Sequence, residues 1–503
     1  MQSDDRTTVQ LSILSPVGYS SSSCGYCTPP GSGKRSSHNT SKSYGVRAHR
    51  LSPYHYQTLI DQGWRRSGDY IYKPDVLRTC CAQIPIRLRV DTFKPNKRHR
   101  RTLTNLLFRV RSSKPKPAKW KGKWSRGRDW DVEKRCDEIL SPCDARQSAE
   151  SAASSAWADE VAGPITHKMQ VRLALASSSD EKYQLFRKYQ AKVHGESQDE
   201  ISTEEGFRRF LVDTSMTLTW PSSRQPLSPM QEAQWRNKSF DLTALPHELP
   251  YGNYHQEYRL DGKLIAVAVL DILPKCVSSV YVFYDPEYND WQLGKVSALE
   301  EIALTKRLGR RTGMAEVACY YMGFYIHTCQ KMKYKAEYGP SELLDCSTYR
   351  WYDLVDVVSK LHVKQAFGWS DAQQQSSQDN FTAQETMHAS KDTQQDRMRL
   401  PTQPIPPPGM LDARAMVEAL DQTLRGSKSS ALGPALDALQ RAMVLESQSQ
   451  GEGIKPVFMS NIFRDHLQSR GEQDEENSEL VQVVECVAAL ANAELVSQTV
   501  LFI

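Results

Sequence analysis

The sequence has no long apolar run. The longest, Leu264–Leu270, falls far short of the roughly 20 residues that a membrane-spanning helix needs. The first residues, Met1–Asp5, are polar and acidic, with no apolar segment behind them, so we expect no secretory signal. A strong net charge is also lacking, because 64 Lys and Arg residues nearly balance 59 Asp and Glu residues. These features argue against a membrane or secreted protein, and we expect a cytoplasmic location, with the nucleus as a second compartment.

At 503 residues the chain is too long for one hydrophobic core, and two or three domains are expected. Composition separates five segments, which are a Cys-rich, basic region at 1–125, a polar linker or insertion at 126–167, a mixed α/β domain at 168–362, a disordered linker at 363–409 and a helical C-terminal extension at 410–503. The disordered assignment rests on Gln373–Gln378 and on a proline-rich end, which carry too few apolar residues to fold. No chemistry can be attached to the C-terminal extension.

The mixed domain has clear strand and helix signals. Asp261-Gly262 is a favoured two-residue hairpin turn, and it joins expected strands at 254–260 and 263–272. A strand at 277–284, an amphipathic helix at 293–308 and a strand at 317–328 should follow. A hairpin, a strand, a crossover helix and a further strand predict an α/β (α+β) fold with a mixed sheet.

Four cysteines form the clearest constellation. Cys24 and Cys27 make a CxxC pair, and the adjacent Cys80 and Cys81 follow later in the chain. Four thiolates suit tetrahedral zinc or an iron–sulfur cluster, provided that the backbone turns at the adjacent pair. The alternative is a redox-active CxxC motif plus two buried core cysteines. The remaining cysteines are interpreted as core or surface residues.

A basic stretch, residues 94–128, holds fourteen Lys or Arg residues and no acidic residue. It also contains four side chains that could stack on unpaired bases, namely His99, Phe108, Trp120 and Trp124. Such charge binds phosphate backbones, and we assign tRNA contacts to a compact group within it: Lys97, Arg98, Arg100 and Arg101. The alternative is a solvated basic loop or a nuclear localisation signal.

Two long stretches carry a resemblance to a known family. The first runs from Cys24 through the motif Gly63-Trp64-Arg65-Arg66-Ser67-Gly68 to Cys81, and the second runs from Tyr281-Val282-Phe283-Tyr284-Asp285-Pro286 through Tyr320–His327 to Tyr338-Gly339-Pro340-Ser341. Both resemble the eukaryotic arginyl-tRNA–protein transferases over about residues 20–110 and 165–355. The resemblance implies a metal-bearing N-terminal domain and a GNAT-like acyltransferase domain at 168–362.

The resemblance also implies an activity. Members of this family, enzymes of protein arginylation, transfer arginine from arginyl-tRNA to the α-amine of proteins that begin with Asp, Glu or oxidised Cys. The product then enters the N-degron pathway of ubiquitin-dependent degradation. In the family the four cysteines are associated with an iron–sulfur cluster or zinc. The expected partners are therefore arginyl-tRNA and acceptor proteins, with no membrane and no DNA.

The reaction needs little covalent chemistry from the enzyme, because the aminoacyl ester is already activated. With a two-residue turn, we expect His255 to face Ala268 and Glu257 to face Ala266. We predict that Glu257 holds or deprotonates the substrate ammonium, or grips the arginyl guanidinium, with help from His255. Asp271 is a third catalytic candidate, although it lies on the other face of the hairpin unless a bulge intervenes. The alternative is an exposed hairpin face with an ordinary charge pattern.

An acidic N-terminal side chain needs cations and polar groups around it. The candidates for substrate binding lie within the motifs quoted above or beside them: Arg65, Arg66, Lys333, Tyr334, Lys335 and Tyr338. The alternative for the lysines is a solvated strand end.

Two other functions compete with aminoacyl transfer. Arg310–Ala315 fits the RxxGxA pattern of acetyl-CoA-binding loops, but it follows the predicted helix and does not open it, so acetyl-CoA is not expected. The other rival is a non-catalytic, metal-bearing RNA-binding protein.

Overall fold

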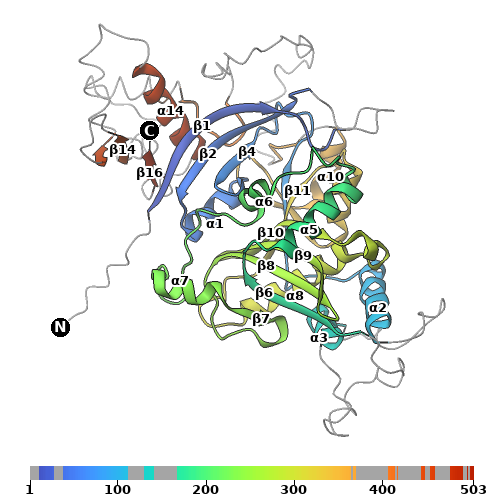
Figure 1. Cartoon of the computed structure of the whole chain (residues 1–503). Coiled ribbons are helices and arrows are strands. Elements are labelled where there is room, and N and C mark those ends of the chain that lie inside the picture. The colour runs from blue at the N-terminus through green and yellow to red at the C-terminus, as the bar shows by residue number, and fades with distance from the viewer. Residues whose placement is uncertain are drawn as a thin grey trace. The chain divides into compact units, whose positions relative to one another are not determined.

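The computed structural model describes residues 11–27, 38–111, 130–140, 167–363, 366–369, 406–413, 416, 443–447, 454–458, 476–490, 496 and 499–502 (Figure 1). Several sequence predictions lie outside these residues, including Trp120, Trp124, the glutamine-rich segment and most of the linker. Within the predicted linker, however, Val132–Leu140 forms helix α3. None of the described helices has the length and apolarity needed to cross a membrane.

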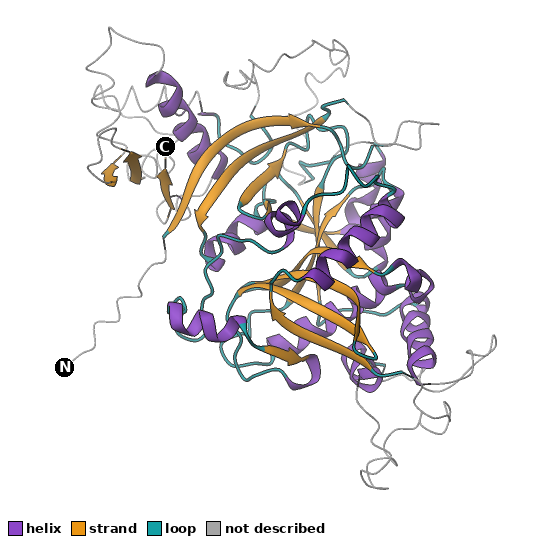
Figure 2. Ribbon diagram, viewed as in Figure 1, coloured by secondary structure: helices purple, strands orange, loops and turns teal. Residues whose placement is uncertain are grey.

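The chain divides into two compact units, each made of separate segments. Unit 1 comprises residues 1–86, 324–334 and 342–503, and unit 2 comprises residues 87–323 and 335–341. Unit 2 therefore includes α2 (Lys97–Arg111) as well as α3, although the sequence placed the first of these helices in the N-terminal region. The combination of strands and helices in both units agrees with the predicted α/β class (Figure 2).

Unit 1 holds a seven-stranded sheet of order β15-β14-β16-β1-β2-β4-β3. Its strands are β1 (Ser12–Ser22), β2 (Ser41–Arg50), β3 (Arg65–Ser67), β4 (Tyr70–Pro74), β14 (Met443–Ser447), β15 (Ile454–Phe458) and β16 (Thr499–Phe502). Helix α1 (Pro53–Asp61) follows β2, and α14 (Glu476–Leu490) contacts β1. The C-terminal extension is thus not only helical, because β16 pairs with β1 and β14 pairs with β16, both in parallel.

The second sheet is mixed, with nine strands in the order β13-β12-β5-β11-β10-β9-β8-β6-β7. Its strands are β5 (Ile84–Arg89), β6 (Met169–Leu175), β7 (Ser239–Asp241), β8 (Gly252–Leu260), β9 (Lys263–Ile272), β10 (Cys276–Tyr284), β11 (Cys319–Tyr325), β12 (Ser341–Leu344) and β13 (Trp351–Asp353). The predicted hairpin is confirmed as β8–β9. Its turn residues have positive φ angles, 52° at Asp261 and 87° at Gly262, as a tight two-residue turn requires.

Helices cover both faces of the hairpin and β10. On one face, α5 (Asp180–Tyr189) and α6 (Glu204–Leu211) share a buried core with Val267, Val269 and Phe283 (Figure 1). On the other face, α8 (Leu293–Gly309) contacts β10. The predicted helix is therefore confirmed, but it is buried on most sides, including Glu300 and Glu301, and not along one apolar stripe alone.

The remaining helical segments are short or lie at the ends of strands. They are the π-helix Gln190–His194, α7 (Pro229–Arg236), α9 (Gln330–Lys333), α10 (Leu354–His362) and the 3₁₀ turns Leu242–Ala244, Pro286–Trp291 and Tyr334–Glu337. The predicted strand at 317–328 is shorter than expected and ends at Tyr325.

The parallel strands β10 and β11 pair over only part of their length. Cys276–Ser278 lies opposite Cys319–Tyr321, and the rest of β10 continues beyond this pairing while remaining bonded to β9. The carboxyl ends of such parallel strands are where α/β sheets commonly bind ligands.

Candidate functional site

The four predicted cysteines of unit 1 come together. The Sγ atoms of Cys24, Cys27, Cys80 and Cys81 all lie within 4.8 Å of one another. Cys27 Sγ lies 3.2 Å from Cys80 Sγ and 3.3 Å from Cys81 Sγ. The adjacent pair sits in a bend, as the sequence argument required, and so both thiols reach the same point. The prediction of a four-cysteine site that could hold a metal is confirmed.

This cluster is set in a partly apolar pocket. Cys24 and Cys81 are buried together with Ile326, and Met332 packs against them. The Thr40 hydroxyl donates to Cys80 Sγ at 3.1 Å. Cys329, which the sequence analysis assigned to core or surface, also packs here. Four sulfurs around zinc lie about 3.8 Å apart, given a Zn–S bond of about 2.3 Å, so the observed spacing fits a tetrahedral ion without large movement.

The hairpin register differs from the prediction. Arg259 faces Leu264, as a two-residue turn requires, but the register shifts between Arg259 and Tyr258. His255 therefore faces Val269, and Glu257 faces Val267, so the predicted pairing with Ala268 and Ala266 is wrong. The shift is a β-bulge in β9. Leu264 and Ala266 lie opposite two consecutive residues of β8, so the residue between Leu264 and Ala266 has no partner position in β8.

The same bulge moves Asp271 onto the face of Glu257. Asp271 lies opposite Asn253, whose side-chain amide donates to Asp271 Oδ1 at 3.0 Å. Asp271 is fully buried. The three catalytic candidates thus share one face, but that face is covered by α5 and α6 and is not open to solvent.

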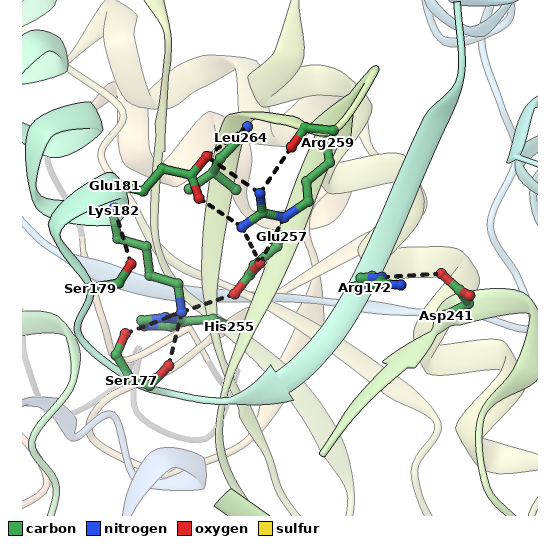
Figure 3. A network of polar contacts seen from close by, with 11 residues as sticks. Arg172, Ser177, Ser179, Glu181, Lys182, Asp241, His255, Glu257, Arg259 and Leu264 are labelled. Atoms are coloured by element: carbon green, nitrogen blue, oxygen red, sulfur yellow. Dashed lines mark hydrogen bonds and ion pairs between the residues drawn. The ribbon is translucent and has the colours of Figure 1, made fainter. Parts of the chain in front are cut away.

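A buried lysine that the sequence analysis missed lies at the centre of this face (Figure 3). The ammonium of Lys182, on α5, lies 2.9 Å from Glu257 Oε1 and 3.1 Å from His255 Nδ1. It also contacts the carbonyl oxygen and the hydroxyl of Ser177, at 3.1 and 3.0 Å. His255 Nε2 lies 3.0 Å from the Leu211 carbonyl. The three ammonium protons of Lys182 therefore have four acceptor atoms within reach, so every donor of this side chain has a hydrogen-bond partner inside the network.

Neighbouring charges extend this Lys182 network to the turn. Glu181 accepts from the Arg259 guanidinium and from the Leu264 amide, while Arg259 also contacts Glu257 Oε2 at 3.2 Å (Figure 3). Burial alone would raise the pKa of the Glu257 carboxyl, but Lys182 and Arg259 outweigh it and hold the pKa below its ordinary value. Burial also lowers the pKa of His255 to about 3. Both side chains are therefore fixed in their charge states at neutral pH.

The comparisons with known proteins agree with these two regions. Residues 22–101 match the family described as "Arginine-tRNA-protein transferase, N terminus", and residues 181–345 match its C-terminal counterpart. The chain is 32% identical to arginyl-tRNA–protein transferase 1 of Drosophila melanogaster, over 70% of this chain and 84% of that protein. This chain belongs to the arginyl-tRNA–protein transferase family.

Two more distant relatives show how far this family likeness extends. Arginyl-tRNA–protein transferase 2 of Arabidopsis thaliana is 27% identical, over 68% of this chain and 74% of the relative. The aspartate/glutamate leucyltransferase of Pseudomonas fluorescens is also 27% identical, over 58% of this chain and 79% of that protein. The similarity therefore extends to a bacterial protein that is named as a leucyltransferase and not as an arginyltransferase.

In this transferase, the tRNA-binding candidates lie on the first turns of α2. Lys97, Arg98 and Arg101 are exposed and Arg100 is half-buried. Arg98 is paired with Glu337 at 2.6 Å. Two expected stacking residues are instead buried, since His99 packs flat against Tyr338 and Phe108 lies in the core. Base stacking by His99 and Phe108 is wrong, and phosphate binding by the four cations stays a prediction.

Three substrate-binding candidates, Lys333, Tyr334 and Lys335, lie in the consecutive helical turns Gln330–Lys333 and Tyr334–Glu337, and their role stays a prediction. Lys333 and Tyr334 belong to unit 1, and Tyr334 is exposed. Lys335 and Tyr338 belong to unit 2. Tyr338 is buried and stacks on His99, which suits packing, so its contact with substrate stays a prediction.

Arg65 and Arg66 are buried in the transferase's N-terminal sheet. Arg65 donates to the carbonyls of Ile60 and Trp64 and lies over the Phe324 ring. Arg66 donates to the carbonyl of Gly68 at 3.2 Å. Burial of both guanidinium groups is consistent with a role in shaping this sheet, and direct substrate contact stays a prediction.

The acetyl-CoA-type loop lies where the sequence placed it. Arg310–Ala315 follows the C-terminal end of α8, and Gly313 packs against Pro221 and Ser222. A helix C-terminus carries a partial negative charge and repels phosphate. The arrangement disfavours a pyrophosphate site at this loop.

Proposed function

We propose that this chain transfers arginine from arginyl-tRNA to the N-terminal α-amine of proteins that begin with Asp, Glu or oxidised Cys. Family membership carries this proposal, since both the N-terminal and the C-terminal family regions are present. Acceptors with acidic N-terminal residues are supported by the name of the Pseudomonas relative, which is called an aspartate/glutamate leucyltransferase. The degradation of the product through the ubiquitin system is part of the same proposal.

The reaction replaces an ester by an amide. The acceptor amine attacks the arginyl carbonyl carbon, a C–N bond forms, and the bond to the ribose oxygen of the tRNA breaks. The enzyme needs to hold two substrates in line and to take up a proton. The part of β10 beyond its pairing with β11 supports an acceptor site there, because α/β sheets commonly bind ligands at the carboxyl ends of such strands.

The tRNA would be held by exposed cations, and α2 supports this part of the proposal. Lys97, Arg98 and Arg101 project from one helix end of unit 2 toward solvent. Phosphate contacts of this kind give affinity without sequence specificity.

The metal would be held by Cys24, Cys27, Cys80 and Cys81. Their spacing favours one tetrahedral zinc ion over an iron–sulfur cluster, because a cluster places several irons and sulfides between the cysteine sulfurs and needs them farther apart. We propose that it stabilises the turns at both cysteine pairs. The reaction would take place in the cytoplasm or nucleus, which keep such thiols reduced.

The catalytic assignment of Glu257, His255 and Asp271 stays a prediction. Their burial supports a positioning role, in which the Lys182 network fixes α5 on the hairpin.

The test is a transfer assay with radiolabelled arginyl-tRNA and matched peptides. A peptide with N-terminal Asp should be labelled, whereas the same peptide with N-terminal Ala, or with an acetylated amine, should not. Equal labelling of the Ala peptide would contradict acidic specificity. Binding of charged tRNA without labelling of any peptide would favour the non-catalytic RNA-binding alternative.

A further inference from the structure

Both cysteine pairs of the candidate metal site follow strands of the same sheet. Cys24 and Cys27 come after β1, and Cys80 and Cys81 lie in a bend after β4. Strand β2 lies between β1 and β4 (Figure 1). Thiols on neighbouring residues point apart along an extended backbone, so both reach one ion only if the chain bends there. Because thiols make weak contacts, other groups are needed to stabilise this bend.

The carboxylate of Asp75 lies at the start of the turn that leads to this bend, and only 1% of the residue is exposed. Its Oδ1 accepts from the main-chain amides of Leu77 and Arg78, at 3.0 and 3.3 Å. Its main-chain carbonyl accepts from the amides of Arg78 and Thr79, at 3.2 and 2.9 Å. An aspartate that binds the amide two residues ahead closes the chain into a tight turn. Asp75 thereby sets the path of the segment that leads to Cys80.

The other oxygen of the same carboxylate connects this turn to β1. Asp75 Oδ2 accepts from the Tyr19 hydroxyl at 2.6 Å and from the Arg78 guanidinium at 2.7 Å. Burial and the neighbouring carboxylate raise the pKa of Tyr19 above its ordinary value, so the hydroxyl keeps its proton and donates. Tyr19 precedes Cys24 by five residues, and Asp75 precedes Cys80 by five. The bond therefore crosses β2 and joins the two chain segments shortly before each cysteine pair.

The far end of the turn is held by Thr40, the residue before β2. The Cys80 amide donates to the Thr40 carbonyl at 3.0 Å, and the Thr40 hydroxyl donates to Cys80 Sγ at 3.1 Å. The Asp75 amide donates to the carbonyl of Lys42 in β2, at 2.9 Å. The segment from Asp75 to Cys80 is thus bound at both ends to the same stretch of chain.

We propose that Asp75 is a positioning residue for the metal site, because its carboxylate preforms the turn that carries Cys80 and Cys81 and holds it against the segment that carries Cys24 and Cys27. This inference rests on the proposed function of the four cysteines as metal ligands. Each carboxylate oxygen already accepts from two donors, so Asp75 acts through the turn and not as a fifth ligand. A preformed turn reduces the conformational entropy that is lost when the ion binds.

The experiment measures the zinc affinity of the full chain by competition with a chelator under anaerobic conditions. Asp75→Asn replaces one carboxylate oxygen by an amide group that donates, so the acceptor for Tyr19 and Arg78 is lost. Zinc affinity should fall by about 10- to 100-fold, as it does when residues that orient metal ligands are replaced. Tyr19→Phe removes a single hydrogen bond and should lower the affinity less.

A spectrum separates positioning from a general loss of stability. Cobalt bound in place of zinc gives the visible absorption bands of a tetrahedral thiolate site, and their intensity depends on the geometry of the four sulfurs. At saturating cobalt these bands should be weaker in Asp75→Asn than in the wild-type chain, because the Cys80–Cys81 turn is no longer held.

The matched control is Asp345→Asn. Asp345 is a fully buried aspartate of the same unit, and its Oδ1 likewise accepts from the amide two residues ahead, that of Ser347, at 2.9 Å. Its other carboxylate oxygen accepts from the Trp369 amide at 2.7 Å. Asp345→Asn should lower the melting temperature as Asp75→Asn does, but it should keep the wild-type zinc affinity and cobalt spectrum.

The outcomes distinguish the positioning role from the metal site itself. Equal losses of zinc affinity in Asp75→Asn and Asp345→Asn, or no loss in Asp75→Asn, overturn the role of Asp75 and leave the metal site intact. If Asp75→Asn does not fold, Tyr19→Phe decides, and wild-type zinc affinity in that variant overturns the role. A wild-type chain that binds neither zinc nor cobalt overturns both the metal site and the role of Asp75.

Discussion

Both the four-cysteine cluster of unit 1 and the Lys182 network of unit 2 gather side chains from distant segments. They differ in how their polar groups are satisfied. The Lys182 ammonium finds acceptors on Glu257, His255 and Ser177 within the chain. The four sulfurs have mainly one another, and thiols are weak donors and acceptors.

This difference separates a ligand site from a structural one. Weak contacts between thiols stabilise such a cluster very little, whereas a bound cation would stabilise it strongly. The four cysteines therefore indicate a metal site. A network whose donors and acceptors match needs nothing from outside. The Lys182 network is therefore best understood as the anchor of α5.

The largest effect is expected at the cysteine cluster. Cys24→Ala or Cys80→Ala should reduce bound metal from a stoichiometric amount to background, because three ligands hold a structural ion poorly. Elemental analysis of anaerobically purified protein measures this, and an absorption spectrum separates iron–sulfur from zinc. Cys276→Ala, a buried cysteine outside the cluster, is the control and should keep its metal. Wild-type protein without zinc or iron would show that the cluster is a thiol site.

A large loss of stability is expected when the Lys182 network is broken. Lys182→Met leaves the Glu257 carboxylate without its main buried partner, so the free energy of unfolding should fall by about 3–5 kcal/mol. Adding Glu257→Gln removes the orphaned charge and should recover part of that loss. Urea unfolding measures both variants. Arg208→Met is the control, because its exposed pair with Asp213 should cost less than about 1 kcal/mol.

The same variants test the catalytic prediction for Glu257. A positioning role predicts that Glu257→Gln loses stability and activity together. A variant with normal melting temperature and greatly reduced transfer would instead identify Glu257 as a catalytic group.

A smaller effect is expected on tRNA binding. Neutralising Lys97, Arg98, Arg100 and Arg101 should flatten the dependence of binding on salt, by about 0.7–0.9 in logarithmic slope for each phosphate that is no longer neutralised. Filter binding at several salt concentrations measures the slope. Neutralising Arg236 and Lys238, which are exposed on and after α7, provides the control. An unchanged slope would make the α2 residues a solvated surface.

The sequence predicted the features that depend on short spacing. The CxxC motif and the Asp261-Gly262 turn each fix local geometry within a few residues, and both were found as expected. The bulge that follows the turn was not predictable, because it depends on how the twisted hairpin packs between two layers of helices. That single inserted residue moved Asp271 to the face of Glu257 and invalidated the alanine pairing.

Other features depend on interactions between segments far apart. Lys182 stands in the first turn of a polar helix, where a lysine is normally exposed, and only the acceptors on Ser177 and β8 explain its burial. The pairing of β16 with β1 joins the two ends of the chain, which periodicity cannot reveal.

The smallest predicted effect is a pH dependence that the Lys182 network imposes on stability. The pKa of His255 falls to about 3 in the folded protein, whereas a histidine in the unfolded chain titrates near 6.5. Between these values the unfolded state binds the additional proton, so stability is complete above about pH 6.5 and declines as pH falls toward 3. The slope from this group should reach about 1.4 kcal/mol per pH unit. His255→Asn can still accept from Lys182 but does not titrate, so urea unfolding between pH 7 and 5 should show a flatter decline. Equal slopes for the two proteins would mean that His255 is accessible to solvent and titrates normally in the folded protein. The Lys182 network would then not be a closed set of matched donors and acceptors, and its contrast with the cysteine cluster would fail.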